Sequence, residues 1–143
     1  MADLHPEARA VLESDALAHM VTLNPDGSPQ VTCVWVGVEG EEIVSAHLPR
    51  NQKVRNVERD ARVALSVEGT GISGPGLRQY LVVRGRARVQ EGGAPELLQR
   101  LARVYLGPDV TFPPMDDPPP GYVLRLTPER LSGVGPWAQR AGG

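Results

Sequence analysis

The chain has 143 residues, of which 41% are hydrophobic and 22% charged, and this is typical of a single soluble domain spanning 1–143. A net charge of −2 argues against the basic surface of a nucleic-acid-binding protein, and no window approaches the roughly 18 apolar residues of a membrane span. The N-terminal residues lack an apolar signal core, and a single cysteine excludes an internal disulfide. We therefore expect a cytoplasmic protein that binds neither nucleic acid nor membrane.

The first half of the chain alternates short apolar runs with turn residues. The sequence NPDGS at 24–28 supplies Pro, Asp and Gly, which favour a turn between two antiparallel strands. The second of these strands is apolar on both faces, a pattern that predicts cover on both sides, as a barrel with an outer partner would give. In order, we predict a helix at 6–13, strands at 18–23, 30–39 and 42–48, a helix at 50–60 and a strand at 61–68.

The second half begins with a glycine-rich segment, GTGISGPG at 69–76. It matches the dinucleotide motif G-x-G-x-x-G, but a strand follows where that motif needs a helix, so a flexible loop that could cover a ligand is the better interpretation. Beyond it we predict a strand at 78–90, a helix at 94–107, a proline-rich loop at 108–121 and a strand at 122–134. Six strands joined mostly by hairpins, with three short flanking helices, predict a mainly β, antiparallel barrel.

The side chains that usually carry catalysis are scattered. His5, His19 and His47 are far apart in the sequence and lack metal-ligand spacing, so no metal site is predicted. Cys33 lies between apolar neighbours in a strand, which favours a small buried hydrophobe over a nucleophile. No Ser-His-Asp set, acid pair or phosphate loop can be assembled, and the catalytic residues stay unknown. An enzyme of this sequence would rely on a bound cofactor.

Five cations lie close together in this acidic chain: Arg50, Lys53, Arg55, Arg59 and Arg62. On a helical wheel Arg55 and Arg59 face solvent, whereas Arg50 and Lys53 begin the apolar stripe. Cations in a first helical turn oppose the helix dipole, at a cost of about 0.3–1 kcal/mol. Either an anion binds at this helix N-terminus, or both side chains extend along the barrel rim to water. The pattern alone leaves both interpretations open.

Three stretches carry a family resemblance. PRNQKVRNVERDAR (49–62), HMVTLNPDGSPQVTCVWV (19–36) and YLVVRGRARV (80–89) resemble the split β-barrel family that binds flavins and deazaflavins. This family groups pyridoxamine 5'-phosphate oxidase-like proteins with oxidoreductases that depend on coenzyme F420. A helix, a proline-rich loop and a closing strand follow in the family's order, so the resemblance covers nearly the whole chain. It implies a homodimer of six-stranded split barrels with a cofactor at each end of the interface.

The resemblance also implies a cofactor-binding site. Lys53 matches a lysine that holds the cofactor phosphate in relatives, and Arg55 matches a family arginine although the wheel places it outside. Asn51 stands where relatives often carry an arginine, with Arg50 adjacent. The implied cofactor-binding residues are Lys53, Arg50, Asn51, Gln52 and Arg55 at the helix, Pro29, Gln30, Val31, Thr32, Ala46 and His47 around the ring, and Gln79 and Tyr80 as further contacts.

The function that follows from the resemblance is an F420-dependent reductase. It would pass a hydride from the reduced deazaflavin to a conjugated, electron-poor small molecule. The short chain, the QKVRN form of the helix and a composition that suggests an actinobacterial source favour F420 over FMN. An FMN-binding oxidase or reductase of the same fold is the alternative, and a third hypothesis is a non-enzymatic protein that binds the cofactor or a tetrapyrrole.

Overall fold

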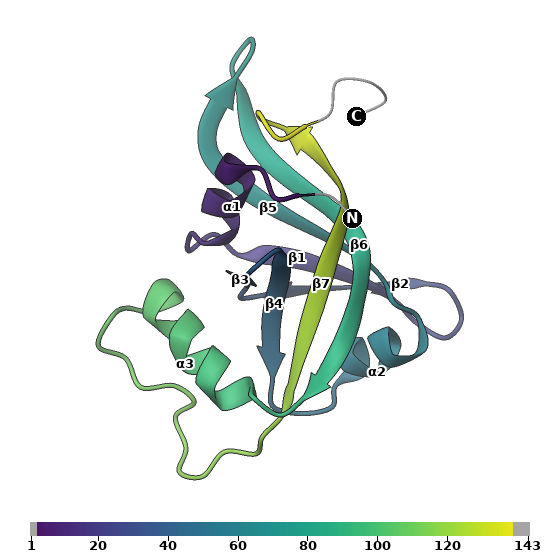
Figure 1. The fold of residues 1–143 in the computed structure, drawn as a ribbon, viewed down its shortest axis with the longest axis vertical. Coiled ribbons are helices and arrows are strands. Elements are labelled where there is room, and N and C mark those ends of the chain that lie inside the picture. Colours follow the sequence, from purple (N-terminus) through teal and green to yellow (C-terminus); the bar gives the residue numbers. More distant parts are fainter. Residues whose placement is uncertain (1–2, 139–143) are drawn as a thin grey trace.

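The computed structural model describes residues 3–138, which fold around one curved antiparallel sheet (Figure 1). Within this range the sheet has seven strands in the order β2–β1–β5–β6–β7–β4–β3. No helix of the described part is long and apolar enough to cross a membrane. The elements are α1 (Pro6–Leu12), β1 (Ala18–Leu23), β2 (Pro29–Val34), β3 (Gly37–Glu39), β4 (Glu42–His47), α2 (Gln52–Arg59), β5 (Arg62–Ser73), β6 (Leu77–Glu91), α3 (Ala94–Tyr105) and β7 (Tyr122–Val134).

The predicted mainly β, antiparallel fold with three helices is confirmed, but the prediction of six strands was wrong. The expected strand at 30–39 is two strands that break at Trp35 and Val36. β2 pairs with β1, whereas β3 pairs with β4 at the other edge of the sheet. At the break, the backbone N–H of Val36 donates to the hydroxyl of Tyr105 at 3.1 Å instead of to a neighbouring strand. A hydrogen bond to a residue 69 positions away therefore stabilises the break at which the chain crosses from one sheet edge to the other.

The glycine-rich segment forms the end of a long hairpin, so the prediction of a flexible loop over 69–76 was wrong. β5 continues to Ser73, and a turn at 74–76 leads directly into β6 (Figure 1, top). Gly74 and Gly76 have φ angles of 55° and 102°, which residues with a side chain rarely adopt. A register shift between Glu68 and Ile72 accommodates the extra residues. A strand follows the glycine motif, so the segment lacks the helix of a dinucleotide site.

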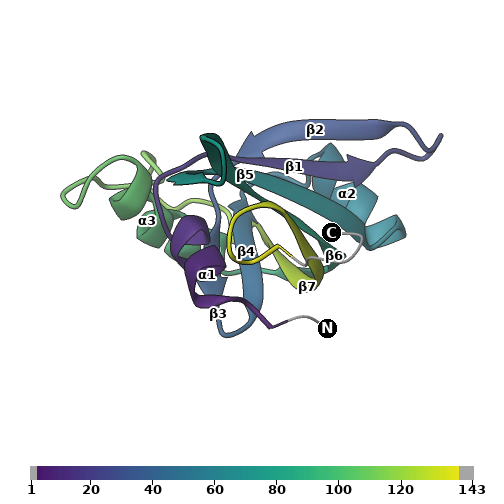
Figure 2. The same cartoon turned by 90° about the horizontal axis from the view of Figure 1, so that it is seen from above.

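Two hydrophobic cores hold these elements together. The larger core lies inside the curved sheet and is closed by α1, which buries Ala8 and Leu12. The smaller core lies between α3 and the outer face of β4, where Ala46 packs with Leu97 and Leu101. Figure 2 shows α1, α2 and α3 at separate positions around the sheet. Because both faces of β4 are covered, its last residues can contribute buried side chains to a site.

The helix α2 is shorter than predicted, and its first residue determines which cations belong to the helix. The side chain of Asn51 caps the helix by accepting the N–H of Val54 at 3.1 Å. Val54 and Val57 are buried as the apolar stripe predicted. Because the first helical residue is Gln52, Lys53 lies in the first turn and Arg50 lies before the cap.

Gly85 lies where the pairing of β6 with β7 changes register. A Cβ at this position would lie 2.1 Å from the carbonyl oxygen of Thr127. We therefore expect Gly85→Ala to lower the free energy of unfolding by about 1–3 kcal/mol, because one strand must shift. Urea denaturation measures this loss. Gly69→Ala is the matched control, since the atoms nearest to its Cβ belong to Gln79 at 3.5 Å, and an equal loss in both variants would contradict the prediction.

Candidate functional site

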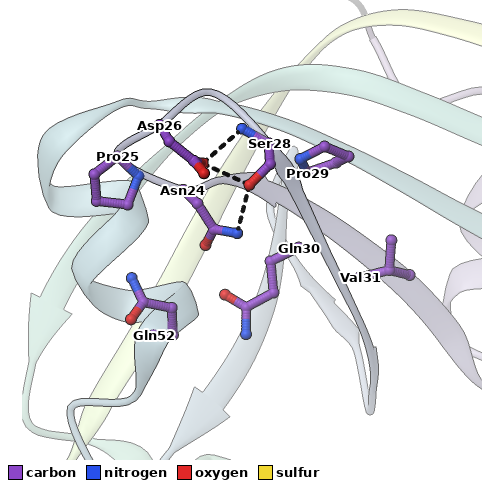
Figure 3. A pocket seen from close by; sticks show the side chains of 8 residues that line it. All are labelled: Asn24, Pro25, Asp26, Ser28, Pro29, Gln30, Val31 and Gln52. Carbon is purple, nitrogen blue, oxygen red and sulfur yellow. Dashed lines mark hydrogen bonds between the residues drawn. The ribbon is translucent and has the colours of Figure 1, made fainter.

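Two hollows follow β2 and meet the first turn of α2. The first, here called the polar hollow, has a volume of about 740 Å³ (Figure 3) and the second, the apolar pocket, about 260 Å³. Gln52 lines the first hollow and its neighbour Lys53 lines the second, so the two are parts of one candidate site. The polar hollow is lined by Asn24, Pro25, Asp26, Ser28, Pro29, Gln30, Val31 and Gln52, and the apolar pocket by Leu17, Cys33, Val34, Trp35, Ala46, His47, Lys53, Leu98 and Phe112.

Lys53 is the only lysine of the sequence, and it lies on the wall of the apolar pocket. Its side chain is half-buried, and this burial lowers the pKa of its ammonium group. Within residues 3–138 it forms no ion pair, whereas the neighbouring Arg50 pairs with Glu58. A partly desolvated cation without a carboxylate partner is stabilised by a bound anion, which would restore the electrostatic interaction that burial removes.

His47 is a buried neutral group beside this cation. Its Nε2 lies 2.9 Å from Oγ of Ser45, which is also buried. Burial first, and then the positive charge of Lys53, lower the pKa of His47 from 6.5 to about 3. The imidazole is therefore uncharged at neutral pH, and it offers the pocket a hydrogen-bonding group without a second positive charge.

The buried His47 makes stability depend on pH. Its pKa in the folded chain, about 3, is below its ordinary value of 6.5, so the unfolded chain binds this proton first as the pH falls. The contribution of neutral His47 to the free energy of unfolding is fully present above pH 6.5. It is lost as the pH falls towards 3, by up to about 1.4 kcal/mol per pH unit. We expect His47→Asn to remove this part of the acid destabilisation, as measured by urea denaturation at several pH values. The exposed His19, replaced by Asn, is the control; an identical pH profile for both variants would contradict this role of His47.

The other cations at α2 have partners within the chain. Nη2 of Arg50 lies 2.7 Å from Oε1 of Glu58, and the Arg50 side chain is 54% exposed, so it does not begin the buried stripe. Arg55 is exposed and donates to the carbonyl of Arg50 at 2.8 Å and to Oε1 of Gln52 at 2.9 Å. The wheel's placement of Arg55 on the solvent face is confirmed. Lys53 thus differs from these arginines, because it is half-buried and faces a pocket.

Asn56 is a central residue that the sequence analysis missed. Its side chain is fully buried, and its Nδ2 lies 3.0 Å from Oγ1 of Thr22, 3.0 Å from Oδ1 of Asn24 and 3.2 Å from Oε1 of Gln30. Its Oδ1 accepts from Nε2 of Gln52 at 2.8 Å. It therefore ties both glutamines of the polar hollow, which Figure 3 shows, to β1 and α2 by hydrogen bonds. The available signal was a polar residue next to Val57 on the buried side of the helix.

The structure brings together most of the predicted site. Thr32 lines neither hollow, and Gln79 donates instead to Oγ of Ser73 at 2.7 Å, while Tyr80 is 42% exposed on the long hairpin. Cys33 is exposed, so the prediction of a buried cysteine was wrong; β2 is an edge strand that this chain leaves uncovered on one side. The predicted residues that do line the two hollows are Pro29, Gln30, Val31, Ala46, His47, Gln52 and Lys53.

Comparison with known proteins assigns the family. Residues 4–135 match the family model of pyridoxamine 5'-phosphate oxidase. The chain therefore belongs to the pyridoxamine 5'-phosphate oxidase-like split-barrel family, a family of flavin and F420 oxidoreductases. No curated protein matches the sequence.

Solved structures agree with this family. The chain is similar to an F420 reductase, with 29% identity and a TM-score of 0.70 over 87% of this chain and 94% of that one. It is also similar to the conserved hypothetical protein Rv2991 from Mycobacterium tuberculosis, with 23% identity and a TM-score of 0.68 over 98% and 89% of the two chains. HupZ of Group A Streptococcus shares the fold at 16% identity, with a TM-score of 0.65 over 96% and 99%.

Proposed function

We propose that this protein is an F420-dependent reductase that delivers a hydride to a conjugated, electron-poor small molecule. The observation that carries the proposal is Lys53, a half-buried cation without an ion pair in the described part of the chain, on the wall of the apolar pocket. The similarity to an F420 reductase at 29% identity favours the deazaflavin over FMN. When bound, reduced F420 supplies the hydride, and solvent or a nearby acid supplies the proton.

The residues of the two hollows suit such a cofactor. Lys53 would bind the phosphate by a charge-assisted contact, with the neutral His47 beside it as a hydrogen-bonding group for the ring. The apolar lining of the second pocket would shield the reacting ring from water. Gln30 and Gln52 offer amide groups to the polar part of the cofactor in the first hollow. The chain's contribution is thus to bind, orient and shield.

We further propose that the protein works as a homodimer. Val31 is 57% exposed and Cys33 is exposed, and both lie on the same, apolar face of the edge strand β2. A second copy would cover this surface. Association would also allow Gln79 and Tyr80, which lie outside both hollows of their own chain, to reach the partner's cofactor. Light scattering is expected to give twice the mass of 15.4 kDa, and Val31→Glu should reduce it to the single chain; a wild-type monomer would overturn the proposal.

The test of the function is to titrate the purified protein separately with F420 and with FMN. We expect F420 fluorescence to be quenched on binding, with higher affinity than FMN. A protein that purifies yellow with flavin and does not quench F420 would instead be an FMN protein of the same fold. Oxidation of reduced F420 across a panel of acceptors then separates an enzyme from a protein that binds the cofactor without turnover.

A further inference from the structure

The apolar pocket has an aromatic wall formed by two rings, and a third ring stacks behind them. The rings of Trp35 and Tyr105 stack with centroids 5.3 Å apart and planes 8° apart. The ring of Phe112 lies against the same Trp35 at 5.2 Å, tilted by 56°. Trp35 and Phe112 both line the pocket, so the wall faces the ligand space. Contacts of this kind favour flat apolar ligands.

The stacked pair is held rigidly. The hydroxyl of Tyr105 donates to the carbonyl of Ala16 at 3.1 Å and accepts the N–H of Val36 at 3.1 Å. Burial, first among its causes, raises the pKa of Tyr105, so its hydroxyl stays protonated and can donate at neutral pH. Trp35 thus packs flat against a ring that cannot move without breaking these hydrogen bonds.

Phe112 is positioned differently, because it comes from the proline-rich loop between α3 and β7 (Figure 1, lower left). The side-chain amide of Gln99 on α3 makes two hydrogen bonds to this loop. Its Nε2 donates to the carbonyl of Val110 at 2.9 Å, and its Oε1 accepts the N–H of Phe112 at 3.0 Å. One helical side chain thus sets the loop backbone on both sides of residue 111.

The lining of the pocket combines polar and apolar side chains. Lys53 and His47 supply polar groups, whereas Leu17, Leu98 and Phe112 offer no side-chain hydrogen bond to a substrate. A polar acceptor group placed against Leu98 or Phe112 would lose hydration without compensation. Ala46, Lys53 and Leu98 lie in regular elements, so the loop residue Phe112 is a part of the wall that can change without disturbing the sheet.

We propose that Phe112 is a specificity-determining residue of this pocket, which favours flat apolar electron acceptors, and that Gln99 is the residue that positions it. This inference rests on the proposed reductase function for the meaning of the acceptor. The binding of flat apolar molecules to the aromatic wall is expected whether or not the protein is a reductase.

The kinetic test compares a flat aromatic acceptor, menadione, with a compact non-aromatic one, 2-cyclohexen-1-one. We expect Phe112→Ala to lower the ratio of kcat/KM for menadione to that for cyclohexenone by about threefold to tenfold, the size of one aromatic contact. Gln99→Ala should change the ratio in the same direction by less, and Phe112→Tyr should retain the wild-type ratio. Arg103→Ala, an exposed change on the same helix, is the control.

A second measurement is independent of turnover. The probe 8-anilinonaphthalene-1-sulfonate combines a flat apolar ring with one anion, and its fluorescence reports binding. We expect Phe112→Ala to weaken its affinity by about threefold to tenfold, while Phe112→Tyr and Arg103→Ala keep the wild-type value. Failure of the wild-type protein to bind F420 would overturn the proposed function. Probe binding would then be the measurement that tests the role of Phe112. A wild-type probe affinity in Phe112→Ala overturns it, as does an unchanged acceptor ratio in an active enzyme.

Discussion

Replacing Lys53 by alanine is expected to weaken F420 binding at least about tenfold, since a charge-assisted contact to phosphate contributes about 1.5–3 kcal/mol. The physical reason is that Lys53 is half-buried and has no ion pair within residues 3–138, so its charge is available to an anion in the pocket. Quenching of F420 fluorescence measures the affinity. Arg103→Ala, which removes an exposed cation on α3, controls for net charge.

The sequence offers a second measurement on the same residue. Because Lys53 is the only lysine, an amine reagent labels one side chain in addition to the N-terminus. Its lowered pKa makes this amine more reactive than an ordinary lysine, and bound cofactor should protect it. Unchanged affinity in Lys53→Ala, together with unchanged labelling when F420 is present, would show that Lys53 only extends along the barrel rim.

The affinity should also depend on pH with a definite sign. Burial lowers the pKa of Lys53 in the free protein, and a bound phosphate raises it again. Cofactor binding therefore takes up a proton at high pH, and the affinity falls as the pH rises through the lowered pKa of the free protein. This decline should disappear in Lys53→Ala. Binding that strengthens with pH would contradict the assignment.

Replacing Asn56 by leucine is expected to lower the free energy of unfolding by about 3 kcal/mol. The substitution keeps the branched shape but leaves the oxygens of Thr22, Asn24 and Gln30 without their shared donor. Urea denaturation measures the loss. F420 binding should weaken as well, because Gln30 and Gln52 lose the partner that orients them in the polar hollow.

The matched control for this network is Gln52→Leu. It removes one hydrogen bond to Asn56 from a side chain that is only partly buried, so we expect a loss of about 1 kcal/mol or less. Equal losses of stability in the two variants would mean that burial of Asn56 has no special role. A stable Asn56→Leu protein with normal F420 affinity would show that Asn56 neither stabilises the fold nor orients the glutamines of the site.

Local patterns were sufficient to predict the element types and part of the site. Alternation and turn residues predicted an antiparallel, mainly β chain, and the apolar stripe of α2 predicted that Val54 and Val57 are buried. The same stripe separated Lys53 from Arg55, since side chains on opposite sides of a helix meet different environments. The family resemblance implied that His47 lies around the cofactor ring, and the structure places His47 on the wall of the apolar pocket.

Tertiary contacts decided the rest. The break after β2 depends on Tyr105, the role of Asn56 depends on Thr22 and Gln30, and Phe112 reaches the pocket only because Gln99 holds its loop. Each of these depends on which atoms from distant segments meet, and periodicity along the chain carries no information about that. The sequence by itself determined the order of most elements and which side of α2 carries the buried apolar residues. The three-dimensional fold decided which residues share one pocket, because a pocket is made by elements that are not neighbours in the chain.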